Sequence, residues 1–128
     1  MTTVKICLAQ KPQPLVTMSV RSDEKVVVAL QLMRDNRVRA VLVINDGKLE
    51  GIITQGDCAI KVLLPGLSAT KTLVSEIMTR SPLTVTMNET LQQCMAIMTK
   101  RNFRHLPVLD KGRVLGMVSI GDIVKDIM

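Results

Sequence analysis

Aromatic side chains are almost absent from this chain, which has no tryptophan, no tyrosine and a single phenylalanine, Phe103. Proteins that bind single-stranded nucleic acid usually stack bases on aromatic side chains. The composition therefore makes nucleic-acid binding the least supported hypothesis, although 17 Lys and Arg against 11 Asp and Glu give a net charge of +6. This positive charge favours a small anionic ligand or an acidic protein surface instead.

Cysteine and histidine are too few and too scattered for a metal site. Cys7, Cys58 and Cys94 show no C-x-x-C spacing, and His105 is the only histidine. Each cysteine lies among apolar neighbours, which predicts buried thiols in a reducing compartment. We therefore expect a cytoplasmic protein that binds no metal.

Three further absences limit the function. No apolar run approaches the ~18 residues of a membrane-spanning helix, and residues 1–10 lack the apolar region of a secretory signal. The glycine-rich loops that cradle nucleotide phosphates are missing. No Ser–His–Asp or Cys–His constellation is supported either, so we expect a protein that is not an enzyme.

An internal repeat organises the chain. When Val20 is placed on Val85, the two halves align without a gap as far as Asp57 on Asp122. Coincident glycines are the most informative matches, because each marks a demand on the backbone rather than on packing. The identical pairs include Glu24 with Glu89, Met33 with Met98, Arg39 with Arg104, Gly47 with Gly112, Gly51 with Gly116 and Gly56 with Gly121.

Each half predicts a strand, a helix, a two-stranded hairpin and a second helix. A half has roughly 60 residues, a marginal size for independent stability. The predicted fold class is therefore α/β (α+β), with two β-α-β-β-α repeats packed into one globular module with approximate twofold symmetry. The predicted segments are strands 16–20 and 83–87, helices 23–36 and 88–102 with Asp23 and Asn88 as N-caps, hairpins turning at Gly47 and Gly112, final helices from Asp57 and Asp122, repeat ranges 1–66 and 74–128, and a linker 67–73.

Short motifs that recur in order and in register resemble the CBS family, and within it the short stand-alone proteins made of one CBS pair. The motifs cover nearly the whole chain. They are Ile77-Met78-Thr79, Arg104-His105-Leu106-Pro107-Val108, Gly116-Met117-Val118 and Ser119-Ile120-Gly121-Asp122 in the second half, and Gly51-Ile52-Ile53 and Thr54-Gln55-Gly56-Asp57 in the first.

The resemblance implies clefts between the repeats that bind AMP, ADP, ATP, NAD(H) or S-adenosylmethionine. Its [Ser/Thr]-x-x-Asp motif, which holds the ribose hydroxyls, falls on Thr54 and Asp57 and on Ser119 and Asp122. A carboxylate can accept hydrogen bonds from both ribose hydroxyls, and such charge-assisted bonds are strong. The alternative is structural, because an aspartate also favours the first turn of a helix.

The resemblance further implies that Arg39, Arg104 and His105 contact the phosphates of the ligand. The alternative is that both arginines are solvated surface residues and that the histidine is a partly buried core residue. It implies an adenine pocket of largely aliphatic side chains, with ordinary core packing as the alternative. The pocket residues would be Met18, Val38, Leu83 and Phe103, with Met18 facing Ser119 and Asp122, and residues 81–83 facing Thr54 and Asp57.

We therefore predict a regulatory module that senses an adenine nucleotide, requires no cofactor, forms a homodimer and modulates a separate effector protein. Ala40 and Leu42 stand where the second half has His105 and Pro107, so we expect the two sites to be unequal. The alternative function is a dimerisation or scaffold module that needs no ligand.

Overall fold

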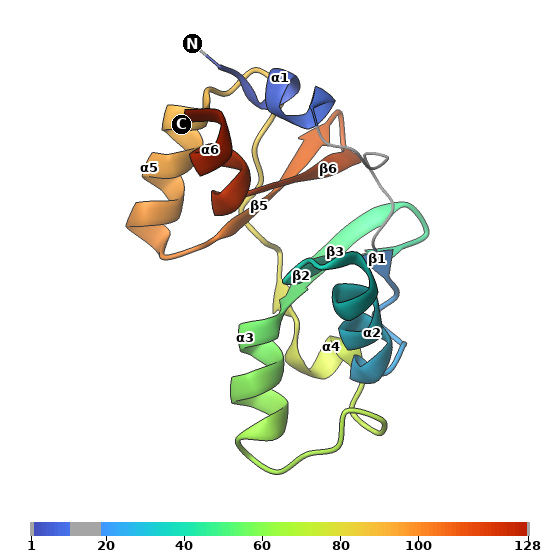
Figure 1. Ribbon diagram of the computed structural model, residues 1–128. Coiled ribbons are helices and arrows are strands. Elements are labelled where there is room, and N and C mark those ends of the chain that lie inside the picture. Colours follow the sequence, from blue (N-terminus) through green and yellow to red (C-terminus); the bar gives the residue numbers. More distant parts are fainter. Residues whose placement is uncertain (1, 11–18, 128) are drawn as a thin grey trace. The chain divides into compact units, whose positions relative to one another are not determined.

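The computed structural model describes residues 2–10 and 19–127 (Figure 1). The chain divides into two compact units. The first-repeat unit is Met18–Pro82, and the second-repeat unit combines Met1–Thr17 with Leu83–Met128. Each unit contains one of the sequence repeats and its own hydrophobic core.

The first-repeat unit is built on a four-stranded sheet in the order β1-β2-β3-β4. Strand β1 runs parallel to β2, whereas β2 with β3 and β3 with β4 are antiparallel. The predicted final helix is present as a short α-helix that continues as a π-helix. The elements are β1 Ser19–Val20, α2 Val26–Asn36, β2 Ala40–Asn45, β3 Lys48–Thr54, α3 Gln55–Cys58, the π-helix η1 Ala59–Leu63, α4 Val74–Ile77 and β4 Thr79–Arg80.

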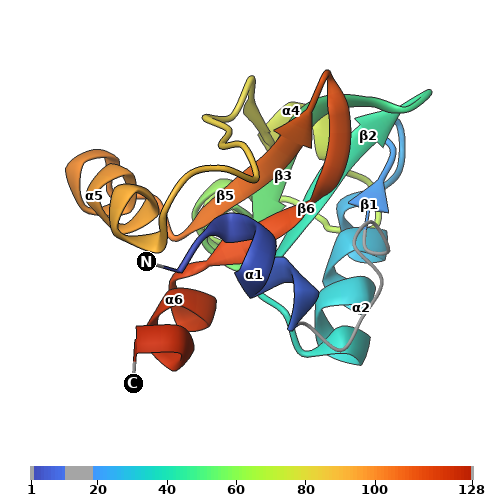
Figure 2. The same cartoon turned by 90° about the horizontal axis from the view of Figure 1, so that it is seen from above.

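The second-repeat unit contains the antiparallel hairpin of β5 and β6. The predicted strand 83–87 is reduced to one parallel bridge, from Val85 to Val108. Helix α1 packs on β6 and α6, as Figure 2 shows. The elements are α1 Val4–Ala9, α5 Leu91–Arg101, β5 His105–Asp110, β6 Arg113–Ser119 and α6 Ile120–Ile127.

The two hairpins confirm the predicted repeat. Ala40 pairs with Thr54 in the first, and His105 pairs with Ser119 in the second. Both turn residues of each hairpin have positive φ, which is the geometry of a type I′ turn. The values are 51° and 78° at Asp46 and Gly47, and 50° and 80° at Lys111 and Gly112.

Each unit borrows a segment that precedes the other repeat in sequence. Thr3 bridges to Thr90, and Leu73 bridges to Lys25. The segments dock through matching backbone hydrogen bonds, from Val4 N to the Glu89 carbonyl (2.9 Å) and from Val74 N to the Glu24 carbonyl (2.8 Å). Helix α1 therefore belongs to the second-repeat unit, and α4 with β4 belongs to the first.

The predicted N-caps Asp23 and Asn88 are wrong, and only the first of the two errors follows from this exchange. Helix α2 begins at Val26 after Lys25, which makes no side-chain cap. The first amide of α2 instead finds an acceptor that is distant in sequence, because Val26 N donates to the Thr72 carbonyl at 2.9 Å. Helix α5 is capped by Thr90, whose hydroxyl accepts from Gln93 N at 3.1 Å.

The cores confirm the predicted helix faces and the buried thiols. Met33 and Met98 are fully buried at equivalent places, and all three cysteines are free and buried. Burial raises the pKa of the Cys58 thiol to about 11, with a further contribution from the charge of Asp57. Burial likewise raises the pKa of Cys94 to about 11, with a smaller contribution from Glu89.

Candidate functional site

A hydroxyl–carboxylate pair lies where β3 ends and α3 begins. Asp57 Oδ2 accepts hydrogen bonds from the backbone N and from the hydroxyl of Thr54, both at 3.0 Å. Thr54 Oγ1 accepts in turn from Asp57 N at 3.1 Å. This reciprocal capping box satisfies two amides that the helix cannot satisfy itself. It also holds both side chains in one orientation.

The second oxygen of Asp57 is occupied by Lys61. The ammonium lies 3.2 Å from Asp57 Oδ1, and it also donates to the Ile77 carbonyl at 3.0 Å. The Asp57 side chain is only 13% exposed, whereas Lys61 is 44% exposed. Lys61 was not predicted as a site residue, although its position four residues after Asp57 was a usable signal for a helical ion pair.

The same pair recurs where β6 meets α6. Ser119 N donates to Asp122 Oδ2 at 2.8 Å, and Asp122 N donates to Ser119 Oγ at 3.1 Å. Both side chains are partly buried. The sequence carries an acidic residue, Asp126, at the place equivalent to Lys61. The two hydroxyl–carboxylate pairs thus share backbone geometry but differ in the charge that follows them in sequence.

Each predicted phosphate-binding arginine directly precedes its hairpin and is tied to the helix start of its own unit. The Arg39 carbonyl accepts from Gln55 N at 3.0 Å, and the Arg104 carbonyl accepts from Ile120 N at 2.9 Å. Both residues are exposed. His105 is half-buried and lies opposite Ser119 in the hairpin register. Within each unit, the arginine therefore lies beside the hydroxyl–carboxylate pair.

The predicted adenine residues are less uniformly placed. Val38 is half-buried and packs on the first core, while Phe103 and Leu83 are exposed parts of the second-repeat unit. Val38 and Phe103 occupy equivalent places, because each donates its backbone N–H at 3.1 Å to the carbonyl of the buried methionine in the last turn of its helix. Met18 lies outside the described residues.

Residues 81–83 were predicted to face Thr54 and Asp57. Within the first-repeat unit, the position of Ser81 relative to β3 is given by the contacts of β4 and of the residue that follows it. Strand β4 pairs Ile52 with Thr79, and Ser81 N then donates to the Glu50 carbonyl at 3.3 Å. Ser81 therefore lies four residues before Thr54 along β3. Before β4, the Ile77 carbonyl is connected to the Asp57 carboxylate through the Lys61 ammonium.

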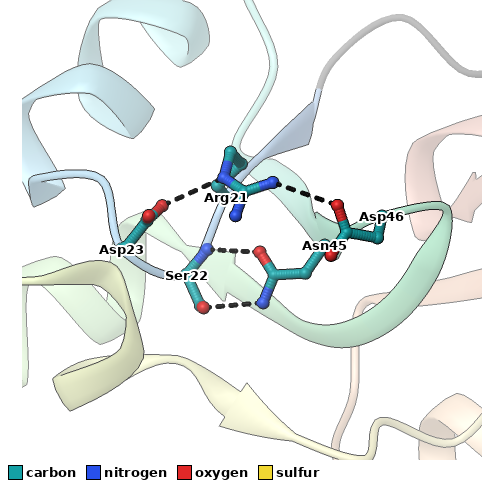
Figure 3. A network of polar contacts seen from close by, with 5 residues as sticks. All are labelled: Arg21, Ser22, Asp23, Asn45 and Asp46. Atoms are coloured by element: carbon teal, nitrogen blue, oxygen red, sulfur yellow. Dashed lines mark hydrogen bonds and ion pairs between the residues drawn. The ribbon is translucent and has the colours of Figure 1, made fainter.

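A separate polar network holds the turn end of the first hairpin (Figure 3). Ser22 N donates to Asn45 Oδ1 at 3.0 Å, and Asn45 Nδ2 donates to Ser22 Oγ at 2.7 Å. Arg21 lies between Asp23 and Asp46, at 3.2 and 3.7 Å. The network joins the residues after β1 to the hairpin turn, at the opposite end of β2 from Arg39.

Within the described ranges 2–10 and 19–127, no group of three or more His, Cys, Asp or Glu side chains could hold a metal ion. Over the same ranges, no helix combines the length and apolar character that crossing a membrane requires.

Comparison with known proteins identifies the family. The model of the CBS domain matches the chain twice, over residues 12–63 and 74–128. A CBS-domain protein of known structure from Burkholderia ambifaria is 40% identical with a TM-score of 0.94, over 99% of this chain and 94% of that one. The chain belongs to the CBS family and carries a pair of CBS domains, as the motifs predicted.

Two further relatives bear on function. The CBS domain pair of the protein MJ0100, solved with 5′-methylthioadenosine and S-adenosyl-L-methionine, is 29% identical with a TM-score of 0.85, over 99% of this chain and 96% of that one. The mitochondrial CBS domain-containing protein CBSX3 of Arabidopsis thaliana is 36% identical over 84% of this chain. The matched region spans 54% of that relative and under one fifth of two others.

Proposed function

We propose that this CBS pair is a regulatory module that binds an adenosine-containing molecule and transmits its presence to a partner protein. The observation that carries the proposal is the recurrence of one hydroxyl–carboxylate pair at the same strand–helix junction in both units. MJ0100, which is similar in sequence and fold, was solved with two adenosyl ligands. A role in regulation rather than catalysis agrees with the family match.

In this proposal the ribose hydroxyls donate to Asp57 or Asp122, because a fixed carboxylate can accept both of them. Arg39 and Arg104, exposed beside these carboxylates, supply cationic donors for phosphate oxygens. AMP, ADP, ATP and NAD(H) would use these arginines, whereas S-adenosylmethionine would not. The remaining proposed contacts are His105 to phosphate, and Met18, Val38, Leu83 and Phe103 to adenine.

The two hydroxyl–carboxylate pairs are expected to bind the ligand with different affinities. The residue opposite Thr54 is Ala40, which has no polar side chain, whereas the residue opposite Ser119 is His105. We therefore propose that the Ser119–Asp122 pair belongs to the tighter site.

The experiment is a thermal-shift series with AMP, ADP, ATP, NADH and S-adenosylmethionine at fixed pH and salt, followed by calorimetric titration of any ligand that stabilises the protein. A ligand at 100 times its Kd adds about 2.7 kcal/mol to the stability of the folded state. Asp122→Asn keeps an oxygen for the cap but loses the charge, so affinity should fall about 10- to 100-fold. The matched control is Asp110→Asn at the exposed end of β5.

The second candidate is a scaffold module that needs no ligand. The capping box favours it, because Thr54 and Asp57 already satisfy each other and the helix start within the protein. No thermal shift with any of the five ligands would reject the sensor for this set and leave the scaffold. A shift that Asp122→Asn reduces and Asp110→Asn does not would support the sensor.

A further inference from the structure

Lys61 connects the proposed ribose carboxylate of the first-repeat unit to the backbone at the end of α4. The helix labelled α3 in Figure 1 continues as η1, which carries Lys61. The Lys61 ammonium lies 3.2 Å from Asp57 Oδ1 and donates to the Ile77 carbonyl at 3.0 Å. Ile77 is the last residue of α4, and carbonyls at a helix end have no partner within the helix. One side chain therefore engages both the carboxylate and a carbonyl that the helix itself cannot satisfy.

The backbone that follows Ile77 leads out of the first-repeat unit, which ends at Pro82. We call residues 77–81 the exit segment. The side chains of Ile77 and Met78 pack in the first core, but β4 is only two residues long. Beyond β4, Ser81 has a φ of 46°, which is uncommon for a residue other than glycine, and its N–H makes a 3.3 Å hydrogen bond to β3. Backbone held in this way opens more readily than a core strand.

The contacts of the Asp57 carboxylate determine where a ligand hydroxyl can bind. Asp57 Oδ2 accepts from the backbone N and from the hydroxyl of Thr54, both at 3.0 Å. These two donors use both lone pairs of that oxygen. A further hydroxyl must therefore approach Oδ1, the oxygen beside the Lys61 ammonium. A hydroxyl bound there takes acceptor capacity from the ammonium, because Oδ1 also has only two lone pairs.

We propose that Lys61 is a positioning residue that transmits a change at the Asp57 carboxylate to the exit segment. In the proposed function, on which this inference rests, that change is a bound ribose. When the ribose hydroxyls engage Oδ1, the ammonium loses its anionic partner and keeps only the Ile77 carbonyl. A lysine that is 44% exposed then gains freedom in water, so this hydrogen bond weakens and the exit segment opens more often. The site thereby signals along the chain.

The experiment is hydrogen exchange, followed by NMR at single backbone amides of the full chain. The two reporters are the Met78 N–H, which donates to the Val74 carbonyl at 3.0 Å, and the Ser81 N–H. The buried Met33 amide inside α2 is the reference for global unfolding. Without ligand, Lys61→Met and Asp57→Asn should each raise exchange at both reporters about 10-fold relative to the reference. The matched control, Lys71→Met at an exposed lysine, should exchange like the wild type.

AMP and S-adenosylmethionine are the probes for the effect of a ligand, because both carry a ribose. A probe whose binding Asp57→Asn weakens should, at saturation, raise exchange at both reporters in the wild type. Lys61→Met should still bind this probe, but its exchange should no longer respond. A lysine with a merely structural role would leave the response to the probe in place.

Circular dichroism establishes that each variant is folded. Exchange at the reporters that is equal in the wild type and in Asp57→Asn would overturn the proposal. So would an increase that Met33 shares equally, or a response to the probe that persists in Lys61→Met. If neither probe binds at Asp57, the proposed function fails there for these two ligands. The comparison of the three ligand-free proteins then still decides whether Lys61 connects the carboxylate to the exit segment.

Discussion

Replacing Lys61 by methionine removes the ammonium that connects the start of α3 to the end of α4. Methionine keeps most of the aliphatic stem of lysine, so the packing of that stem is retained. What is lost is the ion pair to Asp57 Oδ1 at 3.2 Å and the hydrogen bond to the Ile77 carbonyl at 3.0 Å. Ile77 is buried in the first core, so the hydrogen bond connects the helix that follows β3 to this core.

The expected loss of stability follows from the exposure of the two partners. Exposed ion pairs contribute about 0.2–1 kcal/mol. Because Asp57 is 13% and Lys61 44% exposed, this pair belongs at the upper end, about 1 kcal/mol. A hydrogen bond from a charged donor adds about 1 kcal/mol after allowance for the exposure of the lysine. Lys61→Met should therefore lower the free energy of unfolding by about 2 kcal/mol.

Urea unfolding of the wild type, Lys61→Met, Asp57→Asn and the double variant separates the two contributions. Asn at position 57 keeps an oxygen for the Thr54 amide but loses the charge, so the coupling energy isolates the ion pair and should be about 1 kcal/mol at low salt. Lys71→Met, at an exposed lysine of the same unit, controls for a general effect of charge. A coupling energy indistinguishable from zero would refute the assigned role of the pair.

Two other predictions concern backbone space and pH. A Cβ at Gly51 would lie 2.6 Å from the Thr79 carbonyl oxygen, so Gly51→Ala should destabilise the folded state by about 1–3 kcal/mol. A Cβ at Gly56 in α3 would meet no atom closer than 3.6 Å, so Gly56→Ala should be neutral or stabilising. Thermal unfolding of both variants measures the difference. Because the pKa of Cys58 and Cys94 is raised to about 11, both thiols stay protonated up to a higher pH in the folded state than in the unfolded state. Stability should therefore be constant below pH 9 and fall between pH 9 and 11, and Cys94→Ala should reduce that slope; an unchanged slope in the variant would contradict the assignment.

The repeat, the hairpins and the cores were predictable because local signals determine them. Asp46-Gly47 is a preferred pair for a type I′ turn, Gly112 supplies one of the two positive φ angles of the other turn, and the aligned methionines mark equivalent helix faces. The hydroxyl–carboxylate pairs were predictable as well, since each lies within four consecutive residues. Their placement beside Arg39 and Arg104 follows from the hairpin register alone.

What the sequence could not indicate depends on partners that are distant along the chain. The start of α2 is determined by the Thr72 carbonyl, and the first amide of α5 donates to the Thr2 carbonyl at 3.0 Å. Neither contact has a local pattern, and the cap of α2 was therefore placed too early. The cap of α5 was placed too early for a different reason, because Thr90 and Gln93 form a capping box that was a usable local signal. The strand predicted over 83–87 is limited to a bridge at Val85 for a similar reason, because strand propensity does not supply a pairing partner along its whole length.

The exchanged segments also imply an order of folding during synthesis. Every described element of the first-repeat unit lies within Met18–Pro82, so this unit can close as soon as that stretch has left the ribosome. Helix α1 is made first, but the backbone groups that it docks on, at Glu89 and Thr90, are made much later. The N-terminal segment must therefore wait, with Cys7 and Leu8 uncovered, until α5 is complete. A chain that stalls between the two units leaves these apolar residues accessible to chaperones and proteases.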